Sequence, residues 1–308
     1  MSNKPIVSFV IPVLNNMEKA RETTQQLANQ SLKIPIEIIV VDDGSTPAID
    51  FEIEATGHSR FKLLRHQVNQ GRANACNTGF RVASADYVGF LDVDCVPDKH
   101  FVYEIYKMIS LQHNLIFGHV VFNSTEFFEN FENDVQRKRA HNLKNWESEL
   151  TTACVIIKKN LIEAINGFDE KFRHYGFEDR DFFIRLKKQF PNLYPVYNFK
   201  AQVTHCDNLE VNNYLKKFEN AGIYSSRIFS KSHPDIYKAS NYFVFDWKVN
   251  PKLHWIPKPI MSFFLYPTLL LLKILFNYSM NYKIKRMSFK ALKGISFLKG
   301  TLAAHNNS

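Results

Sequence analysis

The sequence predicts an α/β protein with a mostly parallel central sheet flanked by helices, followed by a helical C-terminal extension. Three observations support this prediction. Of the 308 residues, 45% are hydrophobic and 14% are aromatic, which suffices for a large buried core and excludes a disordered chain. Short β-branched apolar runs alternate with helical patterns over the first 120 residues. Residues 247–308 contain ten Lys and Arg and no acid, whereas residues 1–246 are nearly neutral.

The elements expected in the first part of the chain alternate between strands and helices. Strands are predicted at 6–14, 36–41, 61–66, 87–91 and 115–122, and helices at 17–30, 71–84 and 99–112. Connections that contain such helices make neighbouring strands parallel. Ligands of these sheets bind outside the carboxyl ends of the strands, so acids that follow the strands should gather at one edge.

The rest of the chain is less regular. A polar and aromatic stretch at 125–148 is expected to form a helix or a mobile excursion. After it we expect a strand at 150–157, a helix at 158–165, a loop at 166–177, a helix at 178–189, short strands around 194–197 and 201–205, and a helix at about 208–230. We therefore predict a domain at 1–246, with halves at about 5–122 and about 123–246, and a helical extension at 247–308.

The cysteines and the N-terminus indicate a cytosolic protein. Cys76, Cys95, Cys154 and Cys206 are widely spaced and form no CxxC pair, so reduced thiols are expected rather than a zinc ribbon or disulfides. The first 16 residues lack the basic region, apolar core and cleavage site of a secretion signal.

The stretch Asp92-Val93-Asp94 follows the apolar run "YVGFL". Two acids in a solvated turn are the usual explanation of such a pattern. Here, however, a hydrophobic strand brings both carboxylates to the edge where ligands bind, and Mg²⁺ or Mn²⁺ prefers hard oxygen ligands. Because Mg²⁺ commonly combines one or two carboxylates with substrate phosphates, the pair predicts a site for a metal-bound diphosphate.

Two further motifs follow strands. In "VVDDGSTP", Asp43 either belongs to a simple turn or accepts a hydrogen bond from a nucleotide base. In "NQGRANACNTGF", Gly71 and Arg72 either cap a helix or bind phosphate, since Gly allows close approach and Arg pairs with anions.

The motif "HYGFEDRDFF" opens a helix with acids that would complement the helix dipole. The same position would also suit a catalytic base at the mouth of the site. Asp179 is the candidate base, and Glu178 would orient the acceptor. His205 in "QVTHCDN" is either a structural histidine or a metal ligand that approaches Asp94.

Taken together, "VSFVIPVLNN", "IEIIVVDDGS", "NQGRANACNTG", "YVGFLDVD", "GFDEKF" and "GFEDRDFFIRL" resemble glycosyltransferase family 2. The resemblance covers about residues 5–206, with the motifs in the order and spacing of the family. It implies the GT-A fold, which is Rossmann-like, and inverting transfer of a sugar from a nucleotide-diphosphate donor, most simply a UDP-sugar, with Mn²⁺ or Mg²⁺ as cofactor.

The resemblance also implies that 1–246 is a catalytic domain, with a donor-binding half at about 5–122 and an acceptor and catalytic half at about 123–246. It further implies roles for matching residues. Pro12 and Asp43 would contact the nucleoside, and Arg72 and Asn77 would line the donor site. The full set of implied donor-binding residues is Pro12, Val13, Asn15, Asp43, Gly71, Arg72, Asn77, Asp92, Val93 and Asp94, and the implied metal ligands are Asp94, Asp92 and His205. "YGFEDRD" followed by "THCDN" resembles the branch of chondroitin-type polymerases and galactosyltransferases, where a His completes the metal site; Phe177 stands where that branch usually has Gly.

The C-terminal tail suggests a membrane partner. Residues 260–276 are apolar enough for a membrane segment, but Pro267 and Lys273 interrupt them, and lysines on both sides disfavour a span. Residues 283–299 can form a helix with an apolar and a cationic face, which favours either an anionic membrane surface or packing in a core. We therefore expect a cytoplasmic protein, peripheral on the inner face of the cell membrane.

The function expected is transfer of a sugar to a glycan or lipid-linked glycan in surface polysaccharide biosynthesis. A sugar-nucleotide nucleotidyltransferase is the alternative enzyme, and a non-catalytic membrane or nucleic-acid-binding protein is the alternative outside enzymes. A dehydrogenase is disfavoured because no GxGxxG follows the first strand. Binding of nucleic acid is not expected, because the body of the chain has no excess of basic residues.

Overall fold

The computed structural model describes residues 4–30, 32–53, 58–206 and 210–304. The chain divides into two compact units: Met1–Arg173 with Glu178–Asn208, and His174–Phe177 with Leu209–Ser308. They are called the N-terminal unit and the C-terminal unit below. The domain boundary that the sequence predicts after residue 246 lies inside the C-terminal unit, and it stays a prediction.

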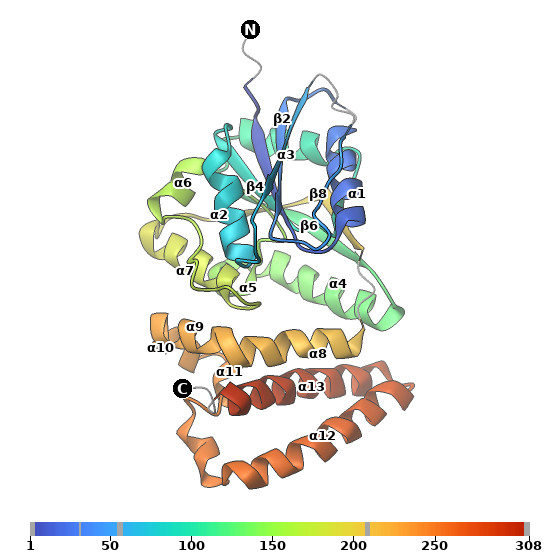
Figure 1. The fold of residues 1–308 in the computed structure, drawn as a ribbon, viewed down its shortest axis with the longest axis vertical. Helices are drawn as coiled ribbons and strands as arrows, with labels where there is room; N and C mark the ends of the chain where they lie inside the picture. Colours follow the sequence, from blue (N-terminus) through green and yellow to red (C-terminus); the bar gives the residue numbers. More distant parts are fainter. Residues whose placement is uncertain (1–3, 31, 54–57, 207–209, 305–308) are drawn as a thin grey trace. The chain divides into compact units, whose positions relative to one another are not determined.

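One mixed sheet forms the centre of the N-terminal unit (Figure 1). Its strands are β1 (Val7–Val13), β2 (Ile36–Asp42), β3 (Ser59–Arg65), β4 (Tyr87–Leu91), β5 (Cys95–Pro97), β6 (Leu115–Asn123), β7 (Cys154–Lys158) and β8 (Val196–Cys206). Their order in the sheet is β3-β2-β1-β4-β7-β6-β8-β5. β7 runs antiparallel to β4 and β6, β5 runs antiparallel to β8, and the other neighbours are parallel. The mostly parallel sheet is therefore confirmed.

Helices cover both faces of this sheet. They are α1 (Met17–Ala28), α2 (Arg72–Val82), α3 (Phe101–Ser110), α4 (Glu126–His141), α5 (Trp146–Glu149), α6 (Lys159–Ala164) and α7 (Glu178–Gln189), with a 3₁₀ turn η1 (Leu143–Asn145). α1 and α3 pack on the face that includes Phe9, whose ring contacts Phe101. α2 and α7 pack on the other face, where Phe182 of α7 meets the ring of Phe90 edge-on. The continuous apolar runs of β1, β2 and β4 are explained by this burial on both sides.

One acid lies in the buried part of β2. Glu37 is 1% exposed, and its carboxylate accepts hydrogen bonds from the hydroxyl of Ser8 and the N–H of Ser84 and pairs with Lys62 at 2.8 Å. Burial alone would raise the pKa of Glu37, but these partners outweigh it and lower the pKa below its ordinary value of 4.5. The charge is therefore stabilised inside the fold.

The strands differ from the sequence predictions in two details. The expected pair at 194–197 and 201–205 is the single strand β8, whose register against β6 shifts between Gly118 and His119. The residues of β8 opposite this shift include polar side chains, which interrupt the apolar pattern of the strand and led to the prediction of two strands. The short strand β5 was not predicted, because three residues carry no readable period.

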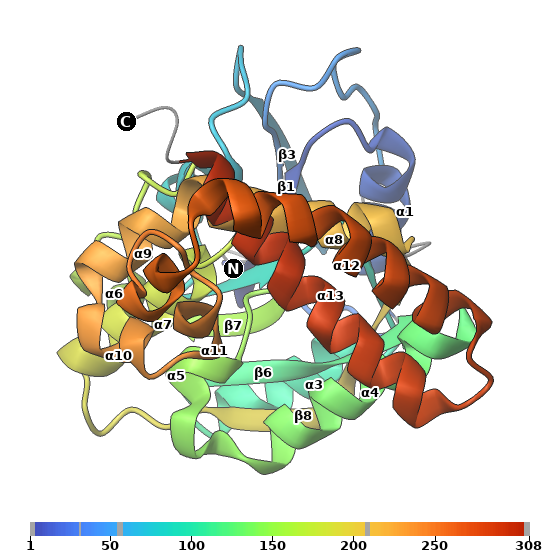
Figure 2. The ribbon, with the colours of Figure 1, turned by 90° about the horizontal axis from the view of Figure 1, so that it is seen from below.

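The C-terminal unit is helical. It contains α8 (Val211–Asn220), a π-helical turn η2 (Ala221–Ser225), α9 (Ser226–Ser232), α10 (Pro234–Lys238), α11 (Asn241–Val244), a 3₁₀ turn η3 (Pro251–Trp255), α12 (Lys258–Tyr278) and α13 (Tyr282–Ala303). The first three elements follow one another and correspond to the helix predicted at 208–230, of which residues 208 and 209 lie outside the described residues. α13 packs against α8 and against α12, which lies beside it (Figure 2).

The last two helices, α12 and α13, differ from the sequence prediction in which apolar face is exposed. The helix predicted at 283–299 forms as part of α13, but Leu292 and Leu298 of its apolar face are buried within the helices of the unit. It is α12 that leaves its apolar side chains exposed, among them Phe263 at 74% and Tyr266 at 79%. By length and composition alone, α12 is long and apolar enough to cross a membrane.

The segment 174–177 belongs to the C-terminal unit. Ser225 donates its hydroxyl to the carbonyls of His174 and Tyr175, and the ring of Phe177 stacks on Phe229 at 4.8 Å. Phe177 has a φ of 70°, the left-handed region that favours glycine. The ring contacts of Phe177 compensate for this backbone conformation at the position where the resembling branch usually has Gly.

Candidate active site

The candidate site lies at the carboxyl ends of β1, β2 and β4. Pro12 and Val13 are buried in the last rung of β1, and the carbonyl of Val13 accepts the N–H of Asp43 at 2.8 Å. Asn15 follows with a φ of 54°; its N–H donates to Ser45, and its side chain accepts the N–H of Thr46. The end of β1 and the turn after β2 are thus joined at the edge where the sequence predicted a nucleoside.

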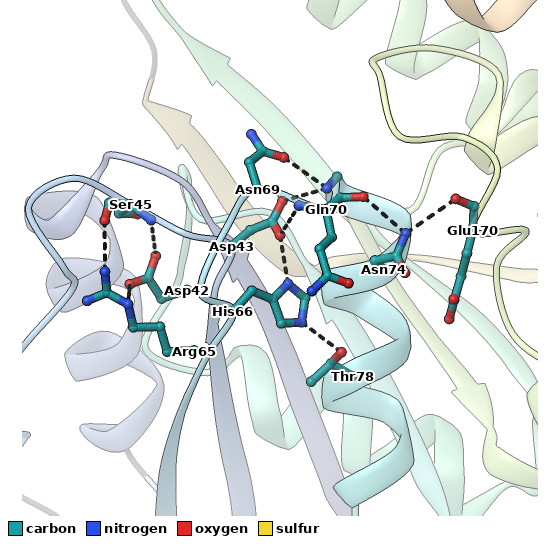
Figure 3. Close-up of polar contacts among 11 residues, drawn as sticks. Asp42, Asp43, Ser45, Arg65, His66, Asn69, Gln70, Asn74, Thr78 and Glu170 are labelled. Carbon is teal, nitrogen blue, oxygen red and sulfur yellow. Dashed lines mark hydrogen bonds and ion pairs between the residues drawn. The ribbon is translucent and has the colours of Figure 1, made fainter.

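Asp42 and Asp43, which end β2, have different environments (Figure 3). Asp42 is fully buried, and its carboxylate accepts the N–H groups of Ser45 and Ile49, with Arg65 at 3.7 Å. Burial opposes its charge, but these partners lower the pKa of Asp42. Asp42 therefore shapes the turn that follows β2.

Asp43 connects β2 to the start of α2. Its Oδ1 accepts the N–H of Gln70 at 2.9 Å and lies 2.7 Å from Nδ1 of His66, while its Oδ2 accepts the N–H of Gly71 at 2.8 Å (Figure 3). The other ring nitrogen of His66 is 2.9 Å from the hydroxyl of Thr78. A carboxylate offers about four lone-pair sites, so these three contacts leave one for a ligand.

Gly71 has a structural reason to be glycine. Its φ is 93°, and a Cβ at this position would clash with the carbonyl oxygen of Arg173. Because its N–H is bonded to Asp43, Gly71 serves to hold the loop that carries the next residue, Arg72.

Arg72 joins the two acidic motifs. Its Nε and Nη2 donate to Oδ1 of Asp92 at 3.1 and 2.5 Å, and its Nη1 lies 3.2 Å from Oδ1 of Asp179. Nη1 also donates to the hydroxyl of Thr152 at 2.9 Å. Burial opposes the charge of Arg72, but the carboxylate of Asp92 outweighs it and raises the pKa of the guanidinium. A permanent cation therefore stands between the candidate donor carboxylate and the candidate base.

Asp179 is in the first turn of α7, and its Oδ1 accepts the Thr152 hydroxyl. Glu178, the preceding residue, is buried. The sequence does not mark Thr152 as a site residue, because Thr152 does not follow a strand of the parallel part of the sheet. Thr152 instead lies just before β7, and because β7 runs antiparallel to β4, its start lies beside the end of β4. The N–H of Asp92 accordingly donates to the carbonyl of Ala153 at 3.0 Å.

Asn77 was expected to line the donor site, but the structure gives it another role. Its Nδ2 donates to the carbonyl of Phe168 and to Glu170, both at 3.0 Å, and its Oδ1 accepts the N–H of Phe168 at 2.8 Å. Asn77 is 2% exposed. These contacts are all made with the loop before α7, so Asn77 clamps that loop, and a contact of Asn77 with the donor stays a prediction.

Asp94 and His205 form a pair that suits a divalent cation. Oδ2 of Asp94 lies 3.3 Å from Nε2 of His205. Two neighbouring ligands of an octahedral ion, each about 2.1 Å from it, lie about 3 Å apart. The His205 ring stacks on Phe122 at 4.6 Å, and Cys206 donates its N–H to the carbonyl of Asp94 at 2.9 Å, so both residues are held in place.

The group around this pair also includes Cys95. Burial raises the pKa of the Cys95 thiol, so the pair offers an oxygen and a nitrogen ligand beside a protonated thiol. The carboxylate suits Mn²⁺ and Mg²⁺ alike, and the imidazole nitrogen suits Mn²⁺ better than Mg²⁺. Asp92 is engaged by Arg72 and is not part of the group, although the sequence predicted it as a ligand. Val93, between the two acids, accepts the hydroxyl of Thr23 at 2.7 Å through its carbonyl. All four cysteines are free thiols.

Comparisons with known proteins agree with this geometry. The family model described as glycosyl transferase family 2 matches residues 8–165, just over half of the chain, and a model described as the N-terminal domain of galactosyltransferase matches residues 135–206. A pre-mycofactocin glycosyltransferase of Mycobacterium tuberculosis is 28% identical over 189 residues, which are 58% of this chain and 38% of that protein. A poly-beta-1,6-N-acetyl-D-glucosamine synthase of Staphylococcus epidermidis is 38% identical over 96 residues, which are 30% of this chain and 22% of that protein. The chain thus spans well under two thirds of these relatives.

A solved structure shows the same fold. It is a mannosyltransferase from Pyrobaculum calidifontis in complex with GDP-Man and Mn²⁺, with a TM-score of 0.59 and 15% identity, over 96% of this chain and 87% of that one. The GT-A fold expected from the sequence is confirmed. On the match of the family model, this chain belongs to glycosyltransferase family 2.

Proposed function

We propose that this chain transfers a sugar from a nucleotide-diphosphate donor to an acceptor hydroxyl, with inversion at the anomeric carbon and with the help of Mn²⁺ or Mg²⁺. One observation supports this most strongly. Through the adjacent residues Gly71 and Arg72, three acids from separate parts of the chain are joined: Asp43 after β2, Asp92 after β4 and Asp179 in α7. A nucleoside site, a diphosphate site and a base would lie in that order.

The donor would bind along the ends of β1, β2 and β4. Pro12, Val13 and Asn15 would border the nucleoside, and Asp43 would use its remaining lone pair for a ring N–H. Arg72 would place its positive charge near the diphosphate, while its N–H groups stay bonded to Asp92, Thr152 and Asp179. A UDP-sugar is the donor that the sequence resemblance suggests, while the structural neighbour from Pyrobaculum calidifontis is a complex with GDP-Man.

Asp94 and His205 would hold the cation. When bound, a divalent cation supplies positive charge that stabilises the diphosphate as the sugar leaves. Asp179 would accept the proton of the acceptor hydroxyl while that oxygen attacks from the face opposite the leaving group, and Glu178 would orient the acceptor. General base catalysis is typically worth about 10²- to 10⁴-fold.

The acceptor would be a glycan or a lipid-linked glycan. The staphylococcal relative, named as a synthase of a poly-N-acetylglucosamine, supports a role in polysaccharide biosynthesis. The exposed apolar face of α12, together with the ten cations and no acid of residues 247–308, supports docking on an anionic membrane at the cytoplasmic face. We therefore propose α12 as the membrane contact, whereas the sequence pattern pointed to 283–299.

A donor screen tests the activity. The chain would be incubated with UDP-, GDP- and dTDP-sugars and Mn²⁺, and the released nucleoside diphosphate would be measured. One donor should be used well, and Asp94→Asn should raise the Mn²⁺ concentration required. Asp86→Asn, an exposed acid at the other end of β4, is the matched control. If no donor is consumed, or if Asp94→Asn needs no more Mn²⁺ than the parent, the proposed chemistry is wrong.

A vesicle assay tests the membrane contact. Phe263→Ser with Phe264→Ser should reduce pelleting with anionic vesicles by at least about 10²-fold, since each buried Phe contributes about 1.5–3 kcal/mol. Val244→Ser, an exposed apolar residue outside α12, is the control and should bind normally. Equal pelleting of all three proteins would exclude α12 as the contact.

A further inference from the structure

The hydroxyl of Thr152 is placed to orient the candidate base. Oδ1 of Asp179 accepts two hydrogen bonds, one from this hydroxyl and one from Nη1 of Arg72 at 3.2 Å. Arg72 also donates to the same hydroxyl at 2.9 Å and reaches the carbonyl of Thr152 with Nη2 at 3.4 Å. The three groups therefore form a closed triangle of hydrogen bonds.

The position of Thr152 is fixed by the sheet. The β4–β7 pairing sets Leu91 opposite Cys154, and the next rung joins the N–H of Asp92 to the carbonyl of Ala153. Thr152 itself is 0% exposed. Because it is β-branched and fully buried, its side chain has little rotational freedom. The hydroxyl is thus held at a fixed place beside α7.

The direction of each hydrogen bond follows from the donors available. A guanidinium can only donate, so the Thr152 oxygen accepts from Arg72, and its single hydrogen is left for the carboxylate of Asp179. Both contacts to Asp179 are made at Oδ1. The oxygen left to take a proton from an acceptor is therefore Oδ2.

We propose that Thr152 is a positioning residue for the base, and that it turns Oδ2 of Asp179 toward the acceptor hydroxyl. This rests on the proposed function. In the step, the acceptor oxygen forms a bond to the anomeric carbon, the bond from that carbon to the diphosphate breaks with its electron pair going to the phosphate oxygen, and the acceptor proton passes to Oδ2. Thr152 takes no proton from the substrate.

Arg72 then links the candidate base to the donor motif. The same guanidinium that holds Asp179 and Thr152 is bound to Asp92 in the donor motif. The base is therefore fixed to the donor-binding strand end through Arg72 and to the β7 side of the sheet through Thr152. Loss of either support would let the carboxylate rotate, and a misplacement of about 1 Å can cost about 10²-fold in rate.

The test compares Thr152→Val with Thr152→Ser. Val keeps the shape and removes the hydroxyl, so kcat of transfer should fall by about 10- to 10²-fold with the donor dissociation constant unchanged. Ser restores the hydroxyl and should recover most of the rate. Thr151→Val, the neighbouring threonine, is the matched control and should behave like the parent. An unchanged kcat in Thr152→Val, or no recovery with Ser, would overturn the proposal.

A double-mutant cycle separates positioning from a general loss of structure. In an Asp179→Asn background the base is already lost, so Thr152→Val should cause no further drop in kcat. Additive losses would refute the positioning role. If the Thr152→Val substitution prevents folding, Thr152→Ala is used in the same cycle. Should Asp179→Asn itself transfer sugar at the parent rate, the assignment of the base fails, an outcome distinct from failure of Thr152 alone.

Discussion

Replacement of Asn77 by alanine should destabilise the N-terminal unit without touching the donor. The side chain makes three hydrogen bonds to the loop before α7, two to the backbone of Phe168 and one to Glu170. Glu170 keeps its contact with Arg81 at 2.6 Å, so its loss is small. Phe168 is 2% exposed, and its N–H and carbonyl would each lose this buried partner.

The magnitude follows from those two groups. Each buried donor or acceptor left without a partner costs about 1–3 kcal/mol, so Asn77→Ala should lower the free energy of unfolding by about 2–6 kcal/mol. That is a large share of the roughly 5–15 kcal/mol that stabilise a typical domain. Urea denaturation followed by circular dichroism measures it.

Asn74→Ala is the control for this prediction. Asn74 lies one turn earlier on α2 and also reaches the loop, donating to the carbonyl of Glu170 at 3.3 Å, but it is half-buried and contacts a single loop atom. It should cost less than about 1 kcal/mol, since its groups can turn to water. A loss below about 1 kcal/mol in Asn77→Ala, combined with weaker donor binding, would show that Asn77 is a donor ligand and that the clamp is unimportant.

Three further changes test other parts of the fold. Gly71→Ala places a Cβ against the carbonyl of Arg173 in a left-handed conformation, so it should lower the melting temperature, and an unchanged melting curve would contradict the contact. The fold lowers the pKa of the Glu37 carboxyl, so the stabilisation by this carboxylate is present above its unfolded pKa of about 4.5 and is lost as pH falls through the folded pKa. The difference in unfolding free energy between the parent and Glu37→Gln should therefore be largest near neutral pH and shrink in acid. A constant difference from pH 7 to pH 3 would contradict the lowered pKa. Gly300 of α13 lies against the carbonyl of Glu219, so Gly300→Ala should destabilise the C-terminal unit. Limited proteolysis of its helices measures this loss, and proteolysis at the parent rate would contradict the close approach.

Much of the fold could be predicted from the sequence because the parallel part of the sheet has a clear pattern. Strands buried on both faces are continuous apolar runs, and the helices between them show their own period. The reversed strand β7 and the three-residue β5 carry no such signal, because strand direction depends on pairing partners that lie far away in the sequence.

The acids of the candidate site could be proposed from the sequence, but the contacts that join them could not. Asp43, Asp94 and Asp179 were candidates because each carboxylate follows a strand or opens a helix, and their roles stay predictions. The use of Asn77 as a clamp could not be predicted, since an amide can bind a ligand or a backbone equally well and only the fold decides. The same holds for the C-terminal helices, where α12 and α13 share similar composition and packing alone determines which one is covered.

The pairing of β5 with β8 has a consequence for the choice of ion. Cys95 lies opposite His205 in this pairing, and the carbonyl of Asp94 accepts the N–H of Cys206, so the strand pairing holds the carboxylate and the imidazole next to each other. Calcium takes six to eight oxygen ligands and magnesium an octahedral set of oxygens, whereas imidazole nitrogen is a ligand of first-row transition ions. A site with one carboxylate and one imidazole should therefore retain Mn²⁺ in preference to calcium and magnesium.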